Sequence, residues 1–317
     1  DSNGNVISNV GPMYAAMVLL GEGYDDAMLF DCLEKAQVSL GYSMHYFAPD
    51  GCGWEGSGYT NYTLSYVTVL LEGLNNFFGD TLGMMDYPGF EGVGRSLAMT
   101  TGRDNNWTSH CEDTPVPYNT TQNMFFTKYY GDYTGQKLNI EQLYKNPAAM
   151  KLHSYLAMKY YLPGAPESTD YPEETDVLYT SSQLGFSRNA WGGKTKTVVG
   201  VHGGYNMDSG CQVDIGNFFY EYKGIVFADD PGIENYAISY TTAYPARAEG
   251  ANVWVVNPDA SYGQSLEGYG DLNMKESKPD GVIYTLDLSS AYEGYVESAL
   301  RGFMLSENRT VFTVQDE

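Results

Sequence analysis

Apolar positions recur at helical spacing through the first half of the chain. The stretch 25–46 shows the pattern most clearly, with apolar side chains three or four positions apart, as in an amphipathic helix. The same spacing predicts helices at 13–20, 62–78, 122–130 and 148–161. Loops rich in Gly, Asp, Asn and Pro separate them, notably 49–59 and 100–120. This alternation predicts an array of helical hairpins over residues 1–162.

The pattern changes after an acidic, Pro-rich segment, 163–176, which has no apolar periodicity and predicts a linker. From 177 onward, short runs rich in β-branched and aromatic residues alternate with turn residues, which is typical of a β-sandwich. The predicted strands are 197–201, 218–222, 253–256, 282–286 and 310–314. Because Glu317 follows a strand-like run directly, we expect the sandwich of 177–317 to be truncated at its C-terminal end.

The charge balance limits the kinds of partner. The 317 residues include 40 acidic and 17 basic side chains, a formal net charge of −23. A nucleic-acid partner requires a basic face, so this balance argues against one, and an acidic sugar would need a local basic patch. An acidic surface also fits an extracellular or periplasmic protein. No run of about 18 apolar residues occurs, so we expect no membrane span.

Tyrosine is unusually frequent, with 29 residues, and four tryptophans accompany it. Aromatic rings stack on sugar faces and the Tyr hydroxyl hydrogen-bonds sugar hydroxyls, so this composition favours a carbohydrate ligand. A Tyr-rich core of helices and strands is the alternative explanation. The four cysteines have no CxxC spacing, which argues against a zinc ribbon and leaves one long-range disulfide as an open alternative.

Three stretches carry motifs whose order and spacing can be compared with known families. They are PDGCGWEGSGYTNY at 49–62, GGYNMDSGCQVDIGNFFYEYKGIVFADDPGIENY at 203–236, and RAEGANVWVVNP at 247–258. Together they resemble the heparinase II/III-like family of polysaccharide lyases over most of the chain. The resemblance implies an α+β multidomain fold, an incomplete (α/α) toroid followed by an antiparallel β-sandwich. It also implies cleavage of an acidic, uronate-containing polysaccharide by β-elimination.

Such an elimination needs three groups. One neutralises the uronate carboxylate, a base removes the C5 proton, and an acid protonates the leaving O4. By resemblance, Tyr62 or Tyr59 stands where the family has its catalytic Tyr, and Glu55 matches the Glu of the same loop. His110, in a polar loop, is a further candidate base. Each Tyr also fits a core or sugar-stacking aromatic, and His110 also fits an ordinary loop histidine.

The resemblance assigns a second set of residues to substrate binding. Arg188 is the predicted partner of a substrate carboxylate, through its planar guanidinium, with a structural ion pair as the alternative. The other predicted contacts are Asn9, Trp54, Asn206 and Gln212.

The sequence departs from the family at three motif histidines: the resemblance implies a base or carboxylate-neutralising group at position 210 and metal ligands at 212 and 251. Gly210, Gln212 and Ala251 replace three motif histidines, so Asp230 is the only family ligand retained. A single carboxylate does not hold zinc, which takes about four ligands, mostly His or Cys. We therefore expect no cofactor, and zinc only at a site rebuilt from His202, Cys211 and Asp230.

Two alternatives to an active lyase remain open at this point. The lost histidines fit a non-catalytic carbohydrate-binding protein on the lyase fold. Helical arrays also occur among glycoside hydrolases, whose paired carboxylates would here be Glu55 with Asp50 or Asp113. The three motif stretches and the predicted sandwich make the hydrolase the weaker reading.

Overall fold

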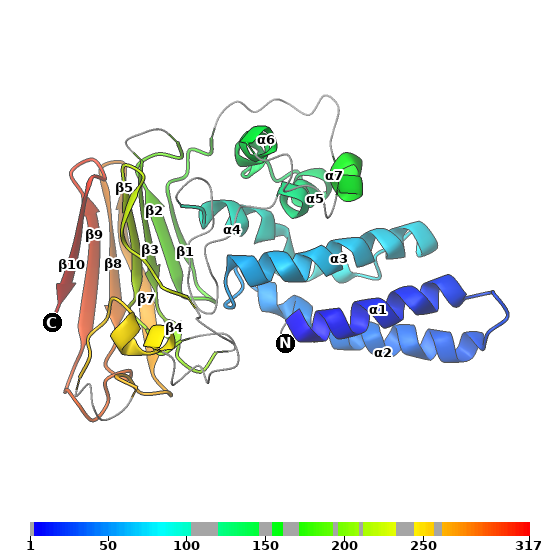
Figure 1. The fold of residues 1–317 in the computed structure, drawn as a ribbon, viewed down its shortest axis with the longest axis horizontal. Coiled ribbons are helices and arrows are strands. Elements are labelled where there is room, and N and C mark those ends of the chain that lie inside the picture. Colours follow the sequence, from blue (N-terminus) through cyan, green and yellow to red (C-terminus); the bar gives the residue numbers. More distant parts are fainter. Residues whose placement is uncertain are drawn as a thin grey trace. The chain divides into compact units, whose positions relative to one another are not determined.

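The computed structural model describes residues 3–102, 120–145, 154–160, 171–192, 196–208, 212–232, 244–256 and 262–317. Over these residues helices come first and antiparallel strands follow (Figure 1). The chain divides into two compact units. The helical unit comprises Asp1–Gly53, Tyr59–Ala98 and Asn119–Thr169, and the β unit comprises Trp54–Gly58, Met99–Tyr118 and Asp170–Glu317.

Most of the elements follow the predicted change of period. The helices are α1 (Asn3–Leu19), α2 (Asp26–Met44), α3 (Ser57–Phe78), α4 (Val93–Met99), α5 (Thr120–Tyr130), α6 (Gln136–Lys145) and α7 (Ser154–Tyr160). The strands are β1 (Asp176–Tyr179), β2 (Leu184–Arg188), β3 (Thr197–His202), β4 (Gly204–Tyr205), β5 (Phe218–Tyr222), β6 (Ile225–Ala228), β7 (Tyr269–Lys278), β8 (Gly281–Asp287), β9 (Leu300–Ser306) and β10 (Val311–Asp316).

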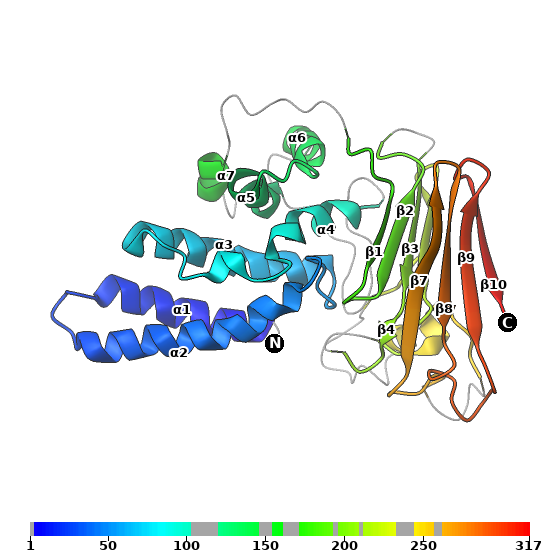
Figure 2. The ribbon, with the colours of Figure 1, turned by 180° about the vertical axis from the view of Figure 1, so that it is seen from behind.

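Helices α1 and α2 form an antiparallel hairpin (Figure 2). The carboxylate of Asp25 caps α2 by accepting hydrogen bonds from the backbone amides of Ala27 and Met28, at 3.1 and 3.2 Å. The amide of Asn5 on α1 donates to the Ser39 carbonyl at 2.8 Å and so ties the two helices together. These polar contacts add to the burial of apolar side chains from both helices, such as Met13 on α1 and Leu40 on α2.

The core of the helical unit is aromatic where the segment just before α4 packs against α5. The ring of Phe90 lies 5.3 Å from that of Phe126 and 6.4 Å from that of Phe125, in edge-to-face arrangements that aromatic quadrupoles favour. Gly94 permits this approach, because a Cβ there would lie 2.6 Å from the Phe126 Cβ. A larger residue at position 94 would force α4 and α5 apart.

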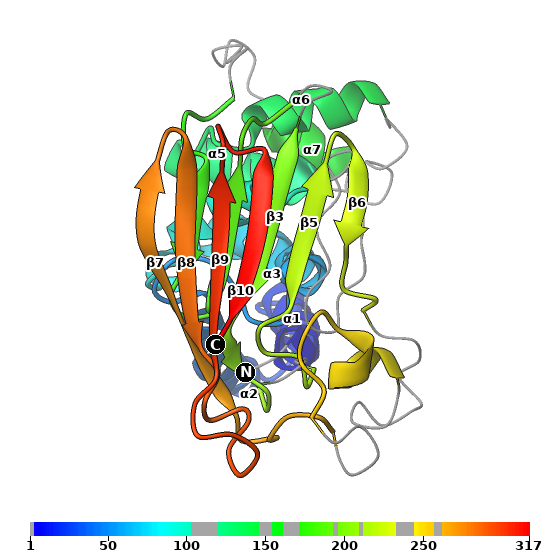
Figure 3. The same cartoon turned by 90° about the vertical axis from the view of Figure 1, so that its left-hand side faces the viewer.

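Two antiparallel sheets form the body of the β unit. One has the strand order β1-β2-β3-β5-β6 and the other β10-β9-β8-β7-β4. Figure 3 shows β7 to β10 in front of β3, β5 and β6. Both sheets contribute to one buried cluster, including Val199 and Val201 from β3 and Leu272, Tyr284 and Leu286 from β7 and β8. Burial of these apolar side chains is the main favourable term in holding the layers together.

A buried ion pair connects the two sheets. Arg309, in the turn between β9 and β10, donates from both terminal nitrogens to the carboxylate of Asp176 on β1, each at 2.6 Å. Both side chains are nearly inaccessible, with exposures of 4% and 6%. A bidentate arginine–carboxylate pair is geometrically specific, so this contact fixes the position of β1 relative to the β9–β10 turn.

The structure corrects one predicted strand and adds a strand that was not predicted. The segment 253–256 is not a strand, because the Trp254 carbonyl accepts from the Tyr292 hydroxyl at 2.9 Å and the indole donates to Asp316 at 2.8 Å. Strand β7 lacks a β-type apolar pattern and was not predicted. The toroid and sandwich classifications stay predictions, and the linker 163–176 lies mostly outside the described residues.

The described chain shows two further features. None of its helices is both long and apolar enough to cross a membrane. Cys32 is a partly buried free thiol and Cys52 is buried, whereas Cys111 and Cys211 lie outside the described residues.

Candidate functional site

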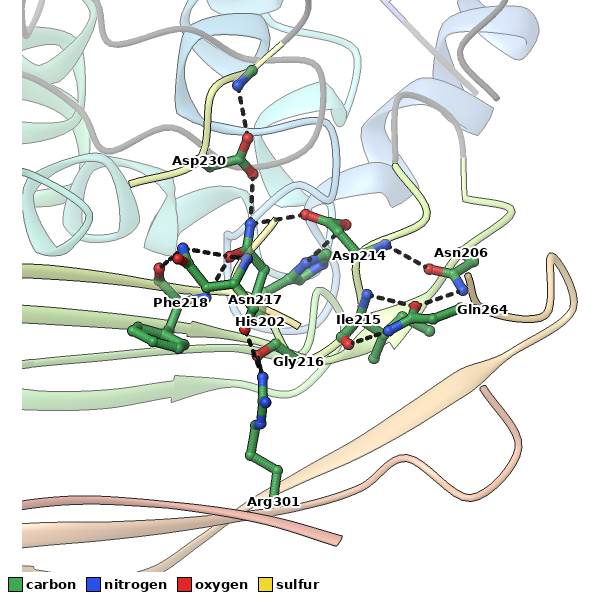
Figure 4. A network of polar contacts seen from close by, with 12 residues as sticks. His202, Asn206, Asp214, Ile215, Gly216, Asn217, Phe218, Asp230, Gln264 and Arg301 are labelled. Atoms are coloured by element: carbon green, nitrogen blue, oxygen red, sulfur yellow. Dashed lines mark hydrogen bonds and ion pairs between the residues drawn. The ribbon is translucent and has the colours of Figure 1, made fainter. Parts of the chain in front are cut away.

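A buried network of polar side chains lies in the β unit where the second motif stretch folds (Figure 4). We call it the carboxylate network, and its central residues are His202, Asp214, Asn217, Asp230 and Asn252. The chain bends sharply between them, since Gly216 adopts φ +95° and its amide donates to the His202 carbonyl at 2.9 Å. A non-glycine residue would be strained in that conformation, which explains a glycine in the motif.

Asn217 is the centre of this network. Its side-chain amide donates to Asp214 at 3.1 Å and to Asp230 at 3.3 Å. Its side-chain oxygen accepts from the backbone and side-chain amides of Asn252, both at 3.0 Å, and from the Phe218 amide at 2.9 Å. One neutral side chain therefore bridges two carboxylates and joins three chain segments.

The two carboxylates lie in a low-dielectric environment. Asp214 is fully buried and Asp230 is 5% exposed. Burial, followed by the negative charge of Asp214, raises the pKa of Asp230 well above its ordinary value. The Gly232 amide donates to Asp230 at 2.7 Å and opposes this shift, and the imidazole of His202 lies 3.8 Å from Asp214. Asp230 can thus retain a proton that an exposed carboxylate would release.

Asn206, a predicted substrate contact, extends the network inward. It is 4% exposed, its amide donates to the Ser265 carbonyl at 2.8 Å, and its oxygen accepts from the Asp214 amide at 3.2 Å. Gln212 is also buried, at 2% exposure. In this arrangement both side chains lie inside the protein, so their contact with substrate stays a prediction.

Arg188 is fully buried at the end of β2. Its guanidinium lies 3.9 Å from the centre of the Trp191 ring and donates to the backbone carbonyls of Met99 and Thr101. Burial lowers its pKa to about 10. The arginine therefore anchors the Met99–Thr101 segment, and a substrate carboxylate would reach it only after a rearrangement.

The predicted catalytic residues are distributed over both units. Trp54 and Glu55 belong to the β unit, where Glu55 is buried, whereas Tyr59 and Tyr62 belong to the helical unit. His110 lies outside the described residues. The hydrolase pair of Glu55 with Asp50 is likewise divided between the units, and Asp113 also lies outside the described residues.

Among the described members of this set, Tyr62 on α3 is the most accessible, with 44% of its surface exposed. Its ring packs edge-to-face on that of Tyr66, one helical turn later, with centroids 5.4 Å apart and hydroxyls 3.4 Å apart. The hydrogen bond with Tyr66 raises the pKa of Tyr62. Tyr62 therefore keeps its proton at neutral pH. Asn9, in contrast, donates to Asn5 and Ser39 within the α1–α2 hairpin.

The structure describes only part of the family's metal position, since residues 209–211 lie outside the described ranges. Within the described ranges, no three His, Cys, Asp or Glu side chains are placed to hold a metal ion. The two oxygens of Asp230 accept hydrogen bonds from Asn217 and Gly232, and Ala251 offers no donor atom. Because Cys211 lies outside the described residues, a rebuilt site that includes it stays a prediction.

Sequence reasoning missed the residues that organise the site. Asn217 and Asn252 lie within the quoted motif stretches, but nothing in their spacing indicates that one bridges two aspartates and contacts the other. Arg301 was also missed. It donates to the carbonyls of Gly216 and Asn252 at 2.9 and 2.7 Å and pairs with Asp316. A buried arginine on an alternating strand is the signal that could have identified it.

Comparisons with known proteins give a match at the level of structure. No protein-family model matches the chain, and no curated protein matches its sequence. Among solved structures, Heparinase III superposes with a TM-score of 0.67 at 13% identity, covering 100% of this chain and 47% of that one. A heparan sulfate lyase HepC mutant from Pedobacter heparinus gives 0.65 at 13% identity, with coverage of 98% and 45%. The Heparinase III-BT4657 gene product gives 0.59 at 15% identity, with coverage of 98% and 44%.

These similarities extend along the whole chain, which spans less than half the length of each matched structure. At such low identity they establish the fold relationship alone. The chain therefore has a heparinase-like fold of helices followed by antiparallel sheets.

Proposed function

We propose that this chain belongs to a polysaccharide lyase that cleaves an acidic, uronate-containing polysaccharide by β-elimination. The observation that carries the proposal is the structural similarity to heparinase III and heparan sulfate lyase over at least 98% of the chain. The motif stretches at 49–62, 203–236 and 247–258 support it independently, because they come from sequence. We also propose an extracellular or periplasmic location and the toroid and sandwich arrangement of that family.

Tyr62 is the residue we assign to the acid step. A base removes the C5 proton, the electron pair forms the C4–C5 double bond, and the C4–O4 bond breaks. The leaving O4 takes the proton of the Tyr62 hydroxyl. This role fits the exposure of Tyr62 and requires only a protonated hydroxyl, whereas a tyrosinate base would require a lowered pKa, opposite to the direction that the hydrogen bond with Tyr66 gives.

The test is an assay for the unsaturated uronate product, followed by its ultraviolet absorbance, with heparosan, hyaluronan, alginate and polygalacturonate as substrates. We expect product from at least one polymer, and we expect Tyr62→Phe to abolish turnover while leaving the fold intact. Tyr24→Phe, which changes an exposed tyrosine in the turn between α1 and α2, is the matched control and should retain activity. Full activity of Tyr62→Phe would remove Tyr62 from the mechanism.

A non-catalytic carbohydrate-binding protein is the second candidate. It is favoured by the replacement of the motif histidines and by Asn217, which engages both carboxylates of the network. Calorimetric titration with the same polymers distinguishes the two functions. Binding without product from any polymer would support the second candidate and reject the first.

Elemental analysis of the purified chain tests the metal assignment separately. We expect no stoichiometric zinc, because the described donor set does not fit it. Zinc at one equivalent, lost in Cys211→Ser, would instead establish a site rebuilt around Cys211. Product formation without zinc would support the tyrosine-based elimination.

A further inference from the structure

The outer face of the sheet β7–β10 contains a hollow of about 500 Å³ that the proposed function does not use. Figure 3 looks onto this sheet. All the lining residues belong to the β unit. Strand pairing places four of them in one row across the sheet, since Asn273 pairs with Thr285, Thr285 with Gly302, and Gly302 with Gln315. We call this cavity the outer hollow.

Gly302 creates the floor of the outer hollow. A Cβ at this position would meet only the Gln315 carbonyl oxygen, at 3.9 Å, so the space above it is open. Its neighbours on the same face of β9, Leu300 and Met304, carry large side chains that are 44% and 38% exposed. A glycine between two large residues therefore produces a depression in an otherwise filled surface.

Polar side chains from β7 and β10 form the two walls. On β7, the amide of Asn273 donates to the carboxylate of Asp271 at 3.0 Å. On β10, the amide of Gln315 donates to the carboxylate of Glu317 at 2.6 Å. Two strands separate these walls, which places them roughly 14 Å apart. Each wall thus presents an amide and a carboxylate, groups that donate to and accept from hydroxyls.

The charge of the lining restricts the ligand. Three carboxylates, from Asp271, Asp287 and Glu317, face one exposed ammonium, that of Lys275. Arg301 lies beneath the sheet and is paired with Asp316. A uronate-bearing chain would be repelled by this lining, whereas an uncharged hydroxyl-rich chain would not. The lining contributes two leucines, of which Leu286 is buried and Leu300 is exposed, so the hollow offers few of the apolar pockets that peptide recognition uses for side-chain anchors.

We propose that the outer hollow is a binding subsite for uncharged oligosaccharides, separate from the site at which an acidic polymer would be cleaved. Its volume lies within the range of small-molecule sites, and its polar walls match a neutral sugar chain lying along the strands. The proposal does not depend on the lyase activity.

The test is calorimetric titration of the full chain with chitohexaose, cellohexaose and mannohexaose, with heparosan and chitosan oligosaccharides as charged probes. We expect at least one uncharged probe to bind and heparosan not to compete with it. Gly302→Ile, which fills the floor, should weaken binding by about tenfold or more, or about 1.4 kcal/mol. Thr313→Ile adds the same side chain to the same face outside the hollow and should bind as the wild type does.

Two smaller substitutions test the same hollow if Gly302→Ile disturbs folding. If Gly302→Ile lowers the melting temperature, Asn273→Ala and Gln315→Ala replace it and should each weaken binding severalfold. Unchanged affinity in the folded variants, no binding of any uncharged probe, or tighter binding of the chitosan probe would overturn the proposal. Lyase activity should be the same in Gly302→Ile and wild type, so the failure of one proposal is distinguishable from the failure of the other.

Discussion

The polar residues of the two units are held in different ways. In the β unit, Arg188, Asn206 and Asp214 are buried and bonded to the protein itself, so their chemistry is committed to the fold. In the helical unit, Tyr62 is exposed and its bonded neighbour, Tyr66, is a partly buried aromatic. Motif residues in the β unit therefore act first as architecture, whereas the accessible chemistry lies with Tyr62.

The largest effect should come from the ion pair that joins the two sheets. We expect Arg309→Met to lower the free energy of unfolding by about 3–5 kcal/mol, because it leaves Asp176 buried without its partner. Urea denaturation followed by tryptophan fluorescence measures the change. Lys35→Met, which removes an exposed pair with Asp31 on α2, is the control and should leave the midpoint unchanged. Equal losses of stability in the two variants would contradict the prediction that the buried pair of the β unit contributes more than the exposed pair of the helical unit.

The next largest effect should come from the centre of the carboxylate network. We expect Asn217→Ala to cost about 2–3 kcal/mol, since Asp214 and Asp230 lose a donor and Asn252 loses an acceptor inside the protein. Urea denaturation followed by tryptophan fluorescence measures this loss in the free energy of unfolding. Asn273→Ala, at a partly exposed amide, should have little effect on stability, and a comparable loss there would show that burial is not the cause.

A polar contact in the helical unit should matter less. The Tyr129 hydroxyl donates to Glu72 at 2.5 Å, and Glu72 also pairs with Lys159. Tyr129→Phe should therefore cost only about 1–2 kcal/mol, because Glu72 keeps one partner. Thermal unfolding compares it with Tyr133→Phe, which alters an exposed ring and should match wild type. A loss in stability as large as that of Arg309→Met would contradict the prediction that this contact of the helical unit matters less than the buried ion pair of the β unit.

The smallest effect should appear at the surface of the β unit. Hydrogen bonds from the side chain and amide of Ser289 lower the pKa of Asp287. The ionised form is therefore favoured in the folded state, and its contribution is present above the ordinary carboxylate pKa of about 3.9 and lost as pH falls through the lowered value. Solvent screening limits it to less than about 0.5 kcal/mol.

Melting temperatures measured from neutral to acidic pH test this contribution. The stability of Asp287→Asn should fall slightly less steeply below about pH 4 than that of wild type. Identical acid profiles would show that Ser289 does not stabilise the ionised carboxylate. The same variant retains the shape of the outer hollow and can be included in the titrations with uncharged sugars.

The order of elements was predictable from the chain because periodicity is a local property. Alternation at helical spacing predicted α2, α3 and α5, and β-branched and aromatic runs predicted β3, β5, β8 and β10. Strand β7 was missed because its polar outer positions and its bulge between Met274 and Glu276 weaken the alternation. The segment 253–256 was wrongly predicted to be a strand, because its apolar side chains pack individually against the core while its backbone does not pair with a neighbouring strand.

The site was less predictable because it depends on contacts between distant positions. The sequence determined the motif order, the replacement of three motif histidines by Gly210, Gln212 and Ala251, and the choice of Tyr62 as a candidate. Only the tertiary structure decided that Asn217 bridges Asp214 and Asp230, residues 16 positions apart from each other in the chain. Burial and pairing arise when segments meet, and they alone determine whether a polar side chain serves the fold or remains accessible to a ligand.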